Sequence, residues 1–367
     1  MTQFLFSKSF LFLVTAQLSA LITVGQKAIS IGTKHQMRST LLNEERDFWI
    51  SLPASYNDSV YSLTNYPVCY FFDGNTHFKN LVANRDWLAS GLYASMPEII
   101  LVGIIQKDRT NELTPTAMKT PEEWKRADFS TSGGYSMFMD FIEQELKPMI
   151  DSTYRTNGYE ILMGHSFGGL ATAYTFVHSP ERYDTYVAID PSIWWDDALL
   201  LKQLETDWNP TSHQNKTFFL AQAGDEGAGD EHHNAIQEFN QKLNHLNNQN
   251  SFSYHYTFYP DDDHGTVVVS AEYAALRSIF NGYQLAVKHV MKDPSLIDNH
   301  YKTVSKNLGY TLSPPEWLLD KMATICEQQE LHLQAEELLY KATIYYPESK
   351  HAQERYKEFM TAKKLGE

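Results

Sequence analysis

The stretch Met163-Gly164-His165-Ser166-Phe167-Gly168-Gly169 decides the fold, because it places one serine inside a glycine-rich turn. An apolar run with strand character, 160–163, precedes the turn, and an apolar helical pattern, 170–178, follows it. The pattern G-x-S-x-G between a strand and a helix is typical of a nucleophile elbow, a sharp turn that lifts the serine hydroxyl out of a sheet. Glycines allow neighbouring backbone to approach closely there. The stretch therefore predicts Ser166 as a nucleophile.

Outward from this turn, short apolar runs alternate with helical patterns. This alternation predicts an α/β protein with a mostly parallel central sheet and helices on both faces. A nucleophile elbow on such a sheet is typical of the α/β-hydrolase fold. Ligands of such sheets bind beyond the carboxyl ends of the strands. The runs that predict strands are 48–53, 67–72, 98–104, 160–163, 186–189, 218–221 and 254–258, and the helical patterns are 138–150, 170–178 and 235–246.

The pattern changes after Tyr283 and is helical to the end of the chain. We expect a hydrolase domain over 26–285 and a small all-helical extension over 286–367. The extension has small and apolar residues at the spacing of a tetratricopeptide repeat. It could pack on the hydrolase body or bind a protein partner. The residues with this spacing are Leu319, Ala323, Cys326, Ala335, Leu339, Ala342 and Pro347.

The N-terminus has the features of a secretory signal. Lys8 precedes an apolar run over 10–24, and Gly25 offers a small residue for cleavage. We expect 1–25 to be a signal peptide, and the protein to be periplasmic or secreted without membrane attachment after cleavage. An uncleaved membrane anchor is the alternative. The formal charge of −15 disfavours nucleic acid and anionic membranes as partners, because both are polyanions.

The chain has two cysteines, Cys69 in an apolar strand pattern and Cys326 in a helical pattern. Thiols in such settings are usually small buried hydrophobic groups. We therefore expect neither a disulfide nor a zinc site.

A nucleophilic serine needs a general base and a carboxylate that orients the base. The chain contains 14 histidines, and His264 directly follows the last predicted strand, in the segment Asp261-Asp262-Asp263-His264-Gly265. The chain order serine, acid, histidine places the acid between these residues. Asp225 and Glu226, in the loop after strand 218–221, both qualify. His232 and His233 begin a helical pattern and are expected at the surface.

The developing oxyanion needs backbone N–H donors. We expect one from Phe167, beside the nucleophile, and one from the turn Gly74-Asn75 after strand 67–72. Trp194 and Trp195 could form a wall of the substrate pocket, with core packing as the alternative for one of them. Arg109 could bind a substrate carboxylate or form a structural salt bridge.

These motifs resemble those of a family of esterases within the α/β-hydrolases, which includes esterase D-like enzymes, ferric-enterobactin esterases and mycolyltransferases. The resemblance implies cleavage of an ester by serine, with neither metal nor other cofactor. It assigns the nucleophile to Ser166, the base to His264, the second oxyanion donor to Asn75 and the acid to Glu226, with Asp225 as the alternative. The motifs, in chain order, are Asp73-Gly74, Asp108-Arg109-Thr110 with Leu113-Thr114-Pro115, the serine turn, Asp190-Pro191-Ser192-Ile193-Trp194-Trp195 and Asp263-His264-Gly265.

The expected function is hydrolysis of a small-molecule carboxylic ester through an acyl-enzyme on Ser166. Three alternatives remain open. The same residues could serve a siderophore esterase of the enterobactin type or an acyltransferase, which differs only in excluding water. The chain could also be a non-catalytic binding protein that uses its C-terminal helices.

Overall fold

The structure is a computed structural model, and it describes residues 28–119, 128–224, 228–247 and 252–366. The chain divides into two units, Met1–Ser30 and Ile31–Glu367. Of the first unit, the structure describes only residues 28–30.

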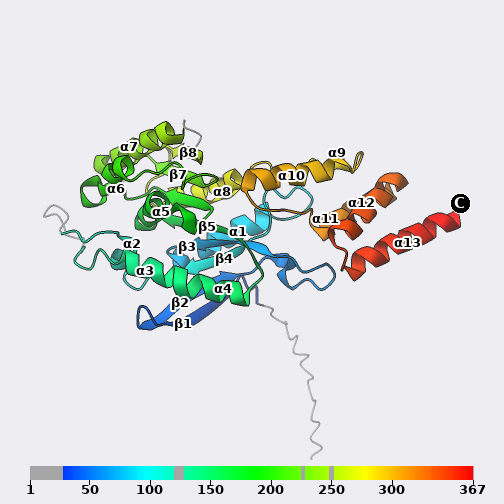
Figure 1. Cartoon of the computed structure of the whole chain (residues 1–367), viewed down its shortest axis with the longest axis horizontal. Helices are drawn as coiled ribbons and strands as arrows, with labels where there is room; N and C mark the ends of the chain where they lie inside the picture. Colours follow the sequence, from blue (N-terminus) through cyan, green and yellow to red (C-terminus); the bar gives the residue numbers. More distant parts are fainter. Residues whose placement is uncertain (1–27, 120–127, 225–227, 248–251, 367) are drawn as a thin grey trace, which may run out of the picture. The chain divides into compact units, whose positions relative to one another are not determined.

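The second unit contains a sheet of eight described strands, ordered β1-β2-β4-β3-β5-β6-β7-β8 (Figure 1). Strand β2 is antiparallel to both of its neighbours, and every other pairing is parallel. The predicted α/β-hydrolase fold with its mostly parallel sheet is confirmed. The strands are β1 (Thr33–Ser39), β2 (Glu44–Ser51), β3 (Tyr66–Phe71), β4 (Ile100–Ile104), β5 (Thr156–His165), β6 (Thr185–Ile189), β7 (Thr217–Ala223) and β8 (Ser253–Tyr259).

Helices cover both faces of the sheet, and the strands alternate their side chains between two hydrophobic cores. In β3, Cys69 and Phe71 face one core, whereas Val68 and Tyr70 face the other. Because both faces are buried, β3 has no exposed position, which explains its continuous apolar sequence.

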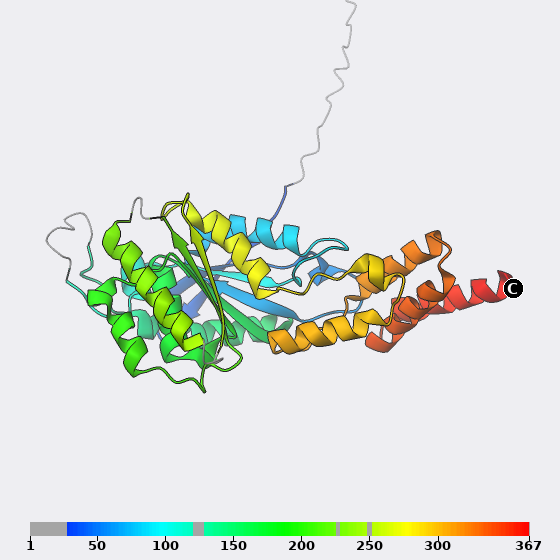
Figure 2. The same ribbon diagram turned by 90° about the horizontal axis from the view of Figure 1, so that it is seen from above.

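The first core lies under α1 (Gly74–Leu88) and α8 (Val267–Ile279), which lie together in Figure 2. The second core lies under the remaining helices of the body. These are α3 (Tyr135–Phe141), the π-helical turn Ile142–Leu146, α4 (Lys147–Thr153), α5 (Phe167–His178), α6 (Trp195–Thr206) and α7 (Asp230–Asn247). The short helix α2 (Arg109–Leu113) precedes them.

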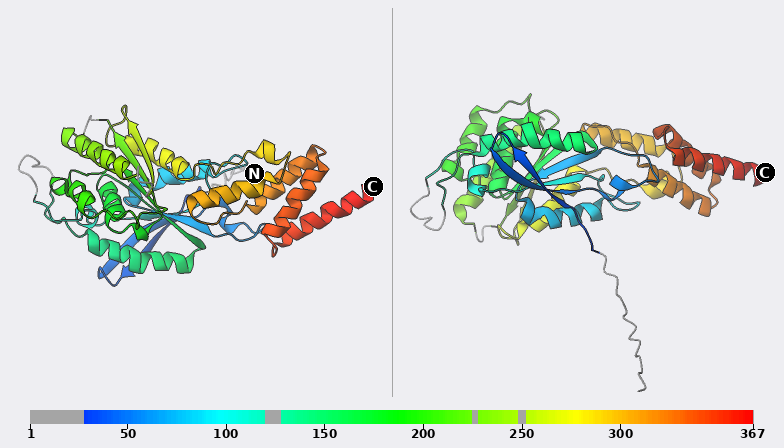
Figure 3. Two further views of the ribbon diagram at one scale, coloured as in Figure 1. Left: turned by 45° about the horizontal axis from the view of Figure 1, so that its top comes forward. Right: turned by 90° about the horizontal axis from the view of Figure 1, so that it is seen from below.

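The C-terminal region is helical from α9 to α13, as predicted (Figure 3). Its buried side chains, Leu319, Ala323 and Ala335 among them, continue the first core of the hydrolase body, so the region packs on the body. Its identity as a tetratricopeptide repeat and its binding of a protein partner stay predictions. The helices are α9 (Val287–Val290), α10 (Leu296–Leu308), α11 (Glu316–Gln328), α12 (His332–Tyr345) and α13 (Lys350–Gly366).

Cys69 and Cys326 are free and buried, as predicted. Burial raises the pKa of the Cys69 thiol. Among the described residues, no helix is both long and apolar enough to span a membrane.

Candidate active site

Ser166 occupies the turn between β5 and α5. Its backbone has a φ of 59° and a ψ of −117°, which is a strained conformation for a residue with a side chain. Three backbone hydrogen bonds of Ser166 hold the turn, one of them from the N–H of Ser192 to the carbonyl of Ser166 at 3.1 Å. The N–H of Ser166 donates to the carbonyl of Ile189 at 3.0 Å, and the N–H of Leu170 donates to the carbonyl of Ser166 at 2.8 Å. The turn therefore has the strand–turn–helix geometry of a nucleophile elbow.

Gly164 is required by the close approach of backbone within the elbow, and Gly168 packs closely against Phe72. A Cβ on Gly164 would lie 2.2 Å from the carbonyl oxygen of Gly168, a clash that no rotation of a side chain could relieve. A Cβ on Gly168 would lie 3.2 Å from the Cβ of Phe72 in the neighbouring strand end. These contacts explain the spacing of the glycines around Ser166.

Three neighbouring strands each end in a non-glycine residue with positive φ. Asp73 follows β3 with a φ of 52°, Ser166 follows β5, and Asp190 follows β6 with a φ of 40°. Such conformations cost energy and concentrate at functional sites. Because parallel strands end at the same edge, all three residues lie at the carboxyl edge of the sheet.

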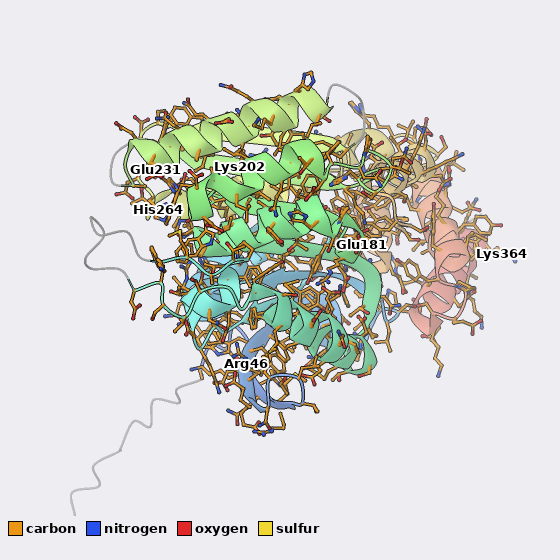
Figure 4. The ribbon with its side chains drawn as sticks, turned by 60° about the vertical axis from the view of Figure 1, so that its left-hand side comes forward. Arg46, Glu181, Lys202, Glu231, His264 and Lys364 are labelled. Carbon is orange, nitrogen blue, oxygen red and sulfur yellow. The ribbon has the colours of Figure 1, made fainter. Side chains whose placement is uncertain are left out.

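His264 lies in the loop between β8 and α8. Its Nδ1 is 2.6 Å from Oδ2 of Asp190, and its side chain is partly exposed. Because an ionised carboxylate only accepts, Nδ1 carries the proton, and Nε2 is left with a free lone pair. Figure 4 shows His264 beside the start of α7, where Glu231 is labelled.

Asp190 is the carboxylate that the structure brings to His264. Its side chain is 2% exposed, and its Oδ1 accepts a hydrogen bond from the N–H of Ala223 at 2.8 Å. Burial raises the pKa of this carboxyl, but hydrogen bonds from His232, His264 and Ala223 outweigh burial and hold the pKa well below its usual range. The carboxylate is therefore ionised at every working pH.

The sequence predicts Glu226 or Asp225 as the acid, and both residues lie outside the described residues. The pairing of Asp190 with His264 was not expected from the sequence, which places the acid after β7, whereas Asp190 follows β6. A signal was present, since Asp190 directly follows the apolar strand that neighbours the nucleophile strand in the sheet.

His232 also contacts Asp190, with its Nε2 2.9 Å from Oδ2. The expectation that His232 lies at the surface is wrong, because the residue is buried in the first turn of α7. A helical pattern alone does not show which other element covers a given face.

Among the described residues, one cluster has potential ligand atoms close enough together, within 4.8 Å, to suggest a metal site. It consists of Asp190, His232 and His264. The distances of 2.6 and 2.9 Å instead fit two N–H···O hydrogen bonds onto the same carboxylate oxygen. A metal ligand needs an unprotonated nitrogen, so this donor arrangement fits a hydrogen-bonded network better than a metal site.

His165 connects the elbow to the His264 loop. Its Nε2 donates to the carbonyl of His264 at 2.8 Å. Burial, followed by the nearby imidazoles of His264 and His77, lowers the pKa of His165 to about 3, so the ring is neutral. His77 is itself buried and donates from Nδ1 to Glu272 at 2.7 Å.

The predicted oxyanion donors, Phe167 and Asn75, lie in the first turns of α5 and α1. Backbone N–H groups in a first turn have no acceptor within their own helix and carry the positive end of its dipole. Asn75, together with Arg109 and His165, lines a surface hollow of about 330 Å³. Of the two predicted donors, Asn75 therefore lines this hollow, which lies beside the elbow.

Arg109 forms a structural salt bridge. Its Nε and Nη2 donate to the two oxygens of Asp73 at 2.8 and 2.9 Å, and Nη2 also lies 3.2 Å from the carbonyl of His165. The guanidinium stacks over Phe167, 5.4 Å from the ring centre. Arg109 thus links the turn before α1 to the elbow.

The two tryptophans have different surroundings. Trp195 is 1% exposed, and its indole N–H donates to Thr116, so it belongs to the core. Trp194 is partly exposed, and its ring lies 6.2 Å from that of Phe167 and 6.3 Å from that of Phe129. Trp194 and Phe167 therefore present aromatic surface near Ser166, with Trp195 behind them.

The sequence matches the model of a protein family described as Putative esterase over residues 39–266. It is 29% identical over 220 residues to the ferri-bacillibactin esterase BesA of Bacillus subtilis, covering 55% of this chain and 72% of that protein. It is 28% identical over 165 residues to the siderophore triacetylfusarinine C esterase of Aspergillus fumigatus. This match covers 42% of this chain and 53% of that protein, so it spans about half of the relative's length.

Among solved structures, the chain resembles an IroE-like serine hydrolase from Shewanella oneidensis, with a TM-score of 0.74 and 27% identity. The match covers 86% of this chain and 99% of that one, so it extends beyond the part that matches the family model. An uncharacterised protein from Capnocytophaga ochracea shares the fold, with a TM-score of 0.60, 16% identity and coverage of 90% of this chain and 99% of that one.

Proposed function

Because the chain belongs to this esterase family, we propose that it hydrolyses a carboxylic ester through a covalent acyl-enzyme on Ser166. The observation that supports this proposal is that a strained serine lies at the same edge of the sheet as a hydrogen-bonded pair, the partly exposed His264 and the buried Asp190. Asp190 takes the role of the acid in this proposal, because it is the described carboxylate that binds Nδ1 of His264.

In the first half of the reaction, Oγ of Ser166 attacks the ester carbonyl carbon while Nε2 of His264 takes the hydroxyl proton. The carbonyl oxygen becomes an oxyanion, which accepts hydrogen bonds from the N–H groups of Phe167 and Asn75. The bond from carbon to the alcohol oxygen then breaks. The imidazolium of His264 returns its proton to the departing alcohol.

In the second half, water attacks the acyl carbon and His264 takes a proton from it. The bond to Ser166 breaks, the acid product leaves, and the serine regains its proton from His264. Asp190 stays ionised throughout and stabilises the imidazolium in both halves. Transfer to an alcohol other than water would use the same groups.

The test is Ser166→Ala, assayed with p-nitrophenyl acetate. We expect kcat to fall by at least about 10⁴-fold, because the acyl-enzyme cannot form. A fluorophosphonate probe should label the wild type and leave the variant unlabelled. Hydrolysis by the variant at the wild-type rate would refute the proposal, and failure of the probe to label the wild type would favour a non-catalytic binding protein.

For the substrate class, we propose an ester with an aromatic or siderophore-like acyl group. One related protein is named a siderophore triacetylfusarinine C esterase and another a ferri-bacillibactin esterase. Trp194 and Phe167 offer flat aromatic surface near Ser166. Comparing kcat/KM for ferric-enterobactin with that for simple esters of graded acyl length tests this. A preference for simple aliphatic esters would exclude the siderophore class.

We also propose that the protein works outside the cytoplasm as a periplasmic or secreted enzyme. The support is the apolar run 10–24 behind Lys8, which lies outside the described residues. Activity of an export-dependent reporter fused after residue 30 tests this proposal, and an inactive reporter would contradict it.

A further inference from the structure

Asp190 accepts hydrogen bonds from two histidines through the same carboxylate oxygen. Oδ2 accepts from Nδ1 of His264 at 2.6 Å and from Nε2 of His232 at 2.9 Å. The other oxygen, Oδ1, accepts from the N–H of Ala223. We propose that His232 is a positioning residue for the esterase reaction, and that it fixes the carboxylate that orients His264. This inference rests on the proposed function.

Burial makes the contribution of His232 difficult to replace. The side chains of Asp190 and His232 are 2% and 7% exposed, so bulk water has little access to the hydrogen bond between them. Without His232, the carboxylate would keep Ala223 and His264 as donors. It could then turn about its side-chain bonds and would no longer hold His264 in one orientation.

His232 is itself held in place by packing between α7 and the sheet. The buried amide of Gln222, in β7, donates to the carbonyl of His233 at 2.9 Å. The hydroxyl of Tyr256, in β8, donates to the carbonyl oxygen of that amide at 2.7 Å. The first turn of α7 is therefore tied to β7 through Gln222, which Tyr256 of β8 holds in turn, and the backbone next to His232 is fixed.

The orientation of His264 matters most while it carries the proton of Ser166. The imidazolium then interacts with Asp190 at a distance of 2.6 Å, and this interaction stabilises the transition state more than the free enzyme. A change in the position of Asp190 should therefore lower kcat and leave KM nearly unchanged.

The experiment compares His232→Ala and His232→Gln, with His245→Ala as the control. His245 lies in the last turn of the same helix, and its side chain is exposed. With p-nitrophenyl acetate, we expect His232→Ala to lower kcat by about 10- to 100-fold, as for the loss of a hydrogen bond to a charged group. His232→Gln, which keeps an N–H donor, should recover most of this loss, and the control should match the wild type.

A second readout does not depend on the substrate. The Nδ1 proton of His264 should give a downfield proton resonance in NMR spectra, assigned by its absence in His264→Ala. We expect the resonance to shift or broaden in His232→Ala and to return in His232→Gln. An unchanged resonance in His232→Ala, or equal losses of kcat in the two His232 variants, would overturn the proposal even if Ser166 proves to be the nucleophile. A changed resonance in a protein without esterase activity would refute the proposed function alone.

Discussion

Two buried carboxylates lie at opposite edges of the sheet and have different partners. At the carboxyl edge, Asp190 accepts from the imidazoles of His264 and His232. At the amino edge, where β3 begins, Glu316 of α11 accepts from the N–H of Ser62 at 2.8 Å and from the hydroxyl of Ser349. Both carboxylates are almost inaccessible to solvent.

The partners decide what each carboxylate can do. An amide and a hydroxyl do not titrate near neutral pH, so Glu316 can only hold the C-terminal helices against the body. An imidazole can take and return a proton in this range, so Asp190 can influence a proton transfer. Burial of a carboxylate therefore does not by itself mark an active site.

The largest effect should follow substitution at the carboxyl edge. In Asp190→Asn, the amide can donate to His264 and thereby favour the wrong tautomer, with the proton on Nε2. We expect kcat to fall by about 10³- to 10⁴-fold, with a folded protein. Steady-state kinetics and circular dichroism check this result. A loss below about tenfold would indicate that another carboxylate, such as Glu226, orients the base.

The reverse result is expected at the amino edge. Glu316→Ala removes the acceptor of one buried donor, Ser349, and one partly buried donor, Ser62, and we expect the free energy of unfolding to fall by about 3 kcal/mol. Chemical denaturation measures the change, and kcat at a temperature where the variant is folded should stay within about twofold of the wild type. A loss of kcat comparable to that of Asp190→Asn would show that the two edges are coupled. The two buried carboxylates would then not have separate roles.

The parts of the molecule that could be predicted from the sequence are those with local causes. The elbow needs glycines next to Ser166, and a fully buried strand such as β3 needs a continuous apolar run, so both are visible in the sequence. Strand β1 was not predicted, because it is a mostly exposed edge strand with the polar sequence TKHQMRS. It is defined by its pairing with β2 rather than by an apolar pattern.

The histidine cluster could not be predicted for a similar reason. Asp190 is 42 positions from His232 and 74 positions from His264 in the sequence, although it is hydrogen-bonded to both. Their contacts depend on the order of β6, β7 and β8 in the sheet and on the packing of α7 over it. Sequence periodicity indicates that α7 is a helix, but it does not indicate that the face of His232 meets a carboxylate.

The smallest effect that we expect is a change of stability with pH, caused by His165 at the carboxyl edge. The pKa of His165 is about 3 in the folded protein and 6.5 when exposed, so between these values the unfolded state binds the additional proton. Acidification through this window therefore favours unfolding, and the contribution of neutral His165 to stability, complete above pH 6.5, is lost as the pH falls. At pH 5 the loss amounts to about 2 kcal/mol.

His165→Gln keeps an N–H donor for the carbonyl of His264 but cannot titrate. We expect its free energy of unfolding, measured in urea at pH 7.5 and pH 5, to fall by about 2 kcal/mol less than that of the wild type. The control is His245→Gln, on the exposed side of α7. Its free energy of unfolding should fall between pH 7.5 and pH 5 by the same amount as that of the wild type. Equal acid losses in His165→Gln and the wild type would mean that His165 is protonated without cost. In that case the contact between His165 and the His264 loop would not depend on pH. The imidazole contacts at the carboxyl edge would then not differ in this respect from the hydroxyl and amide contacts at the amino edge.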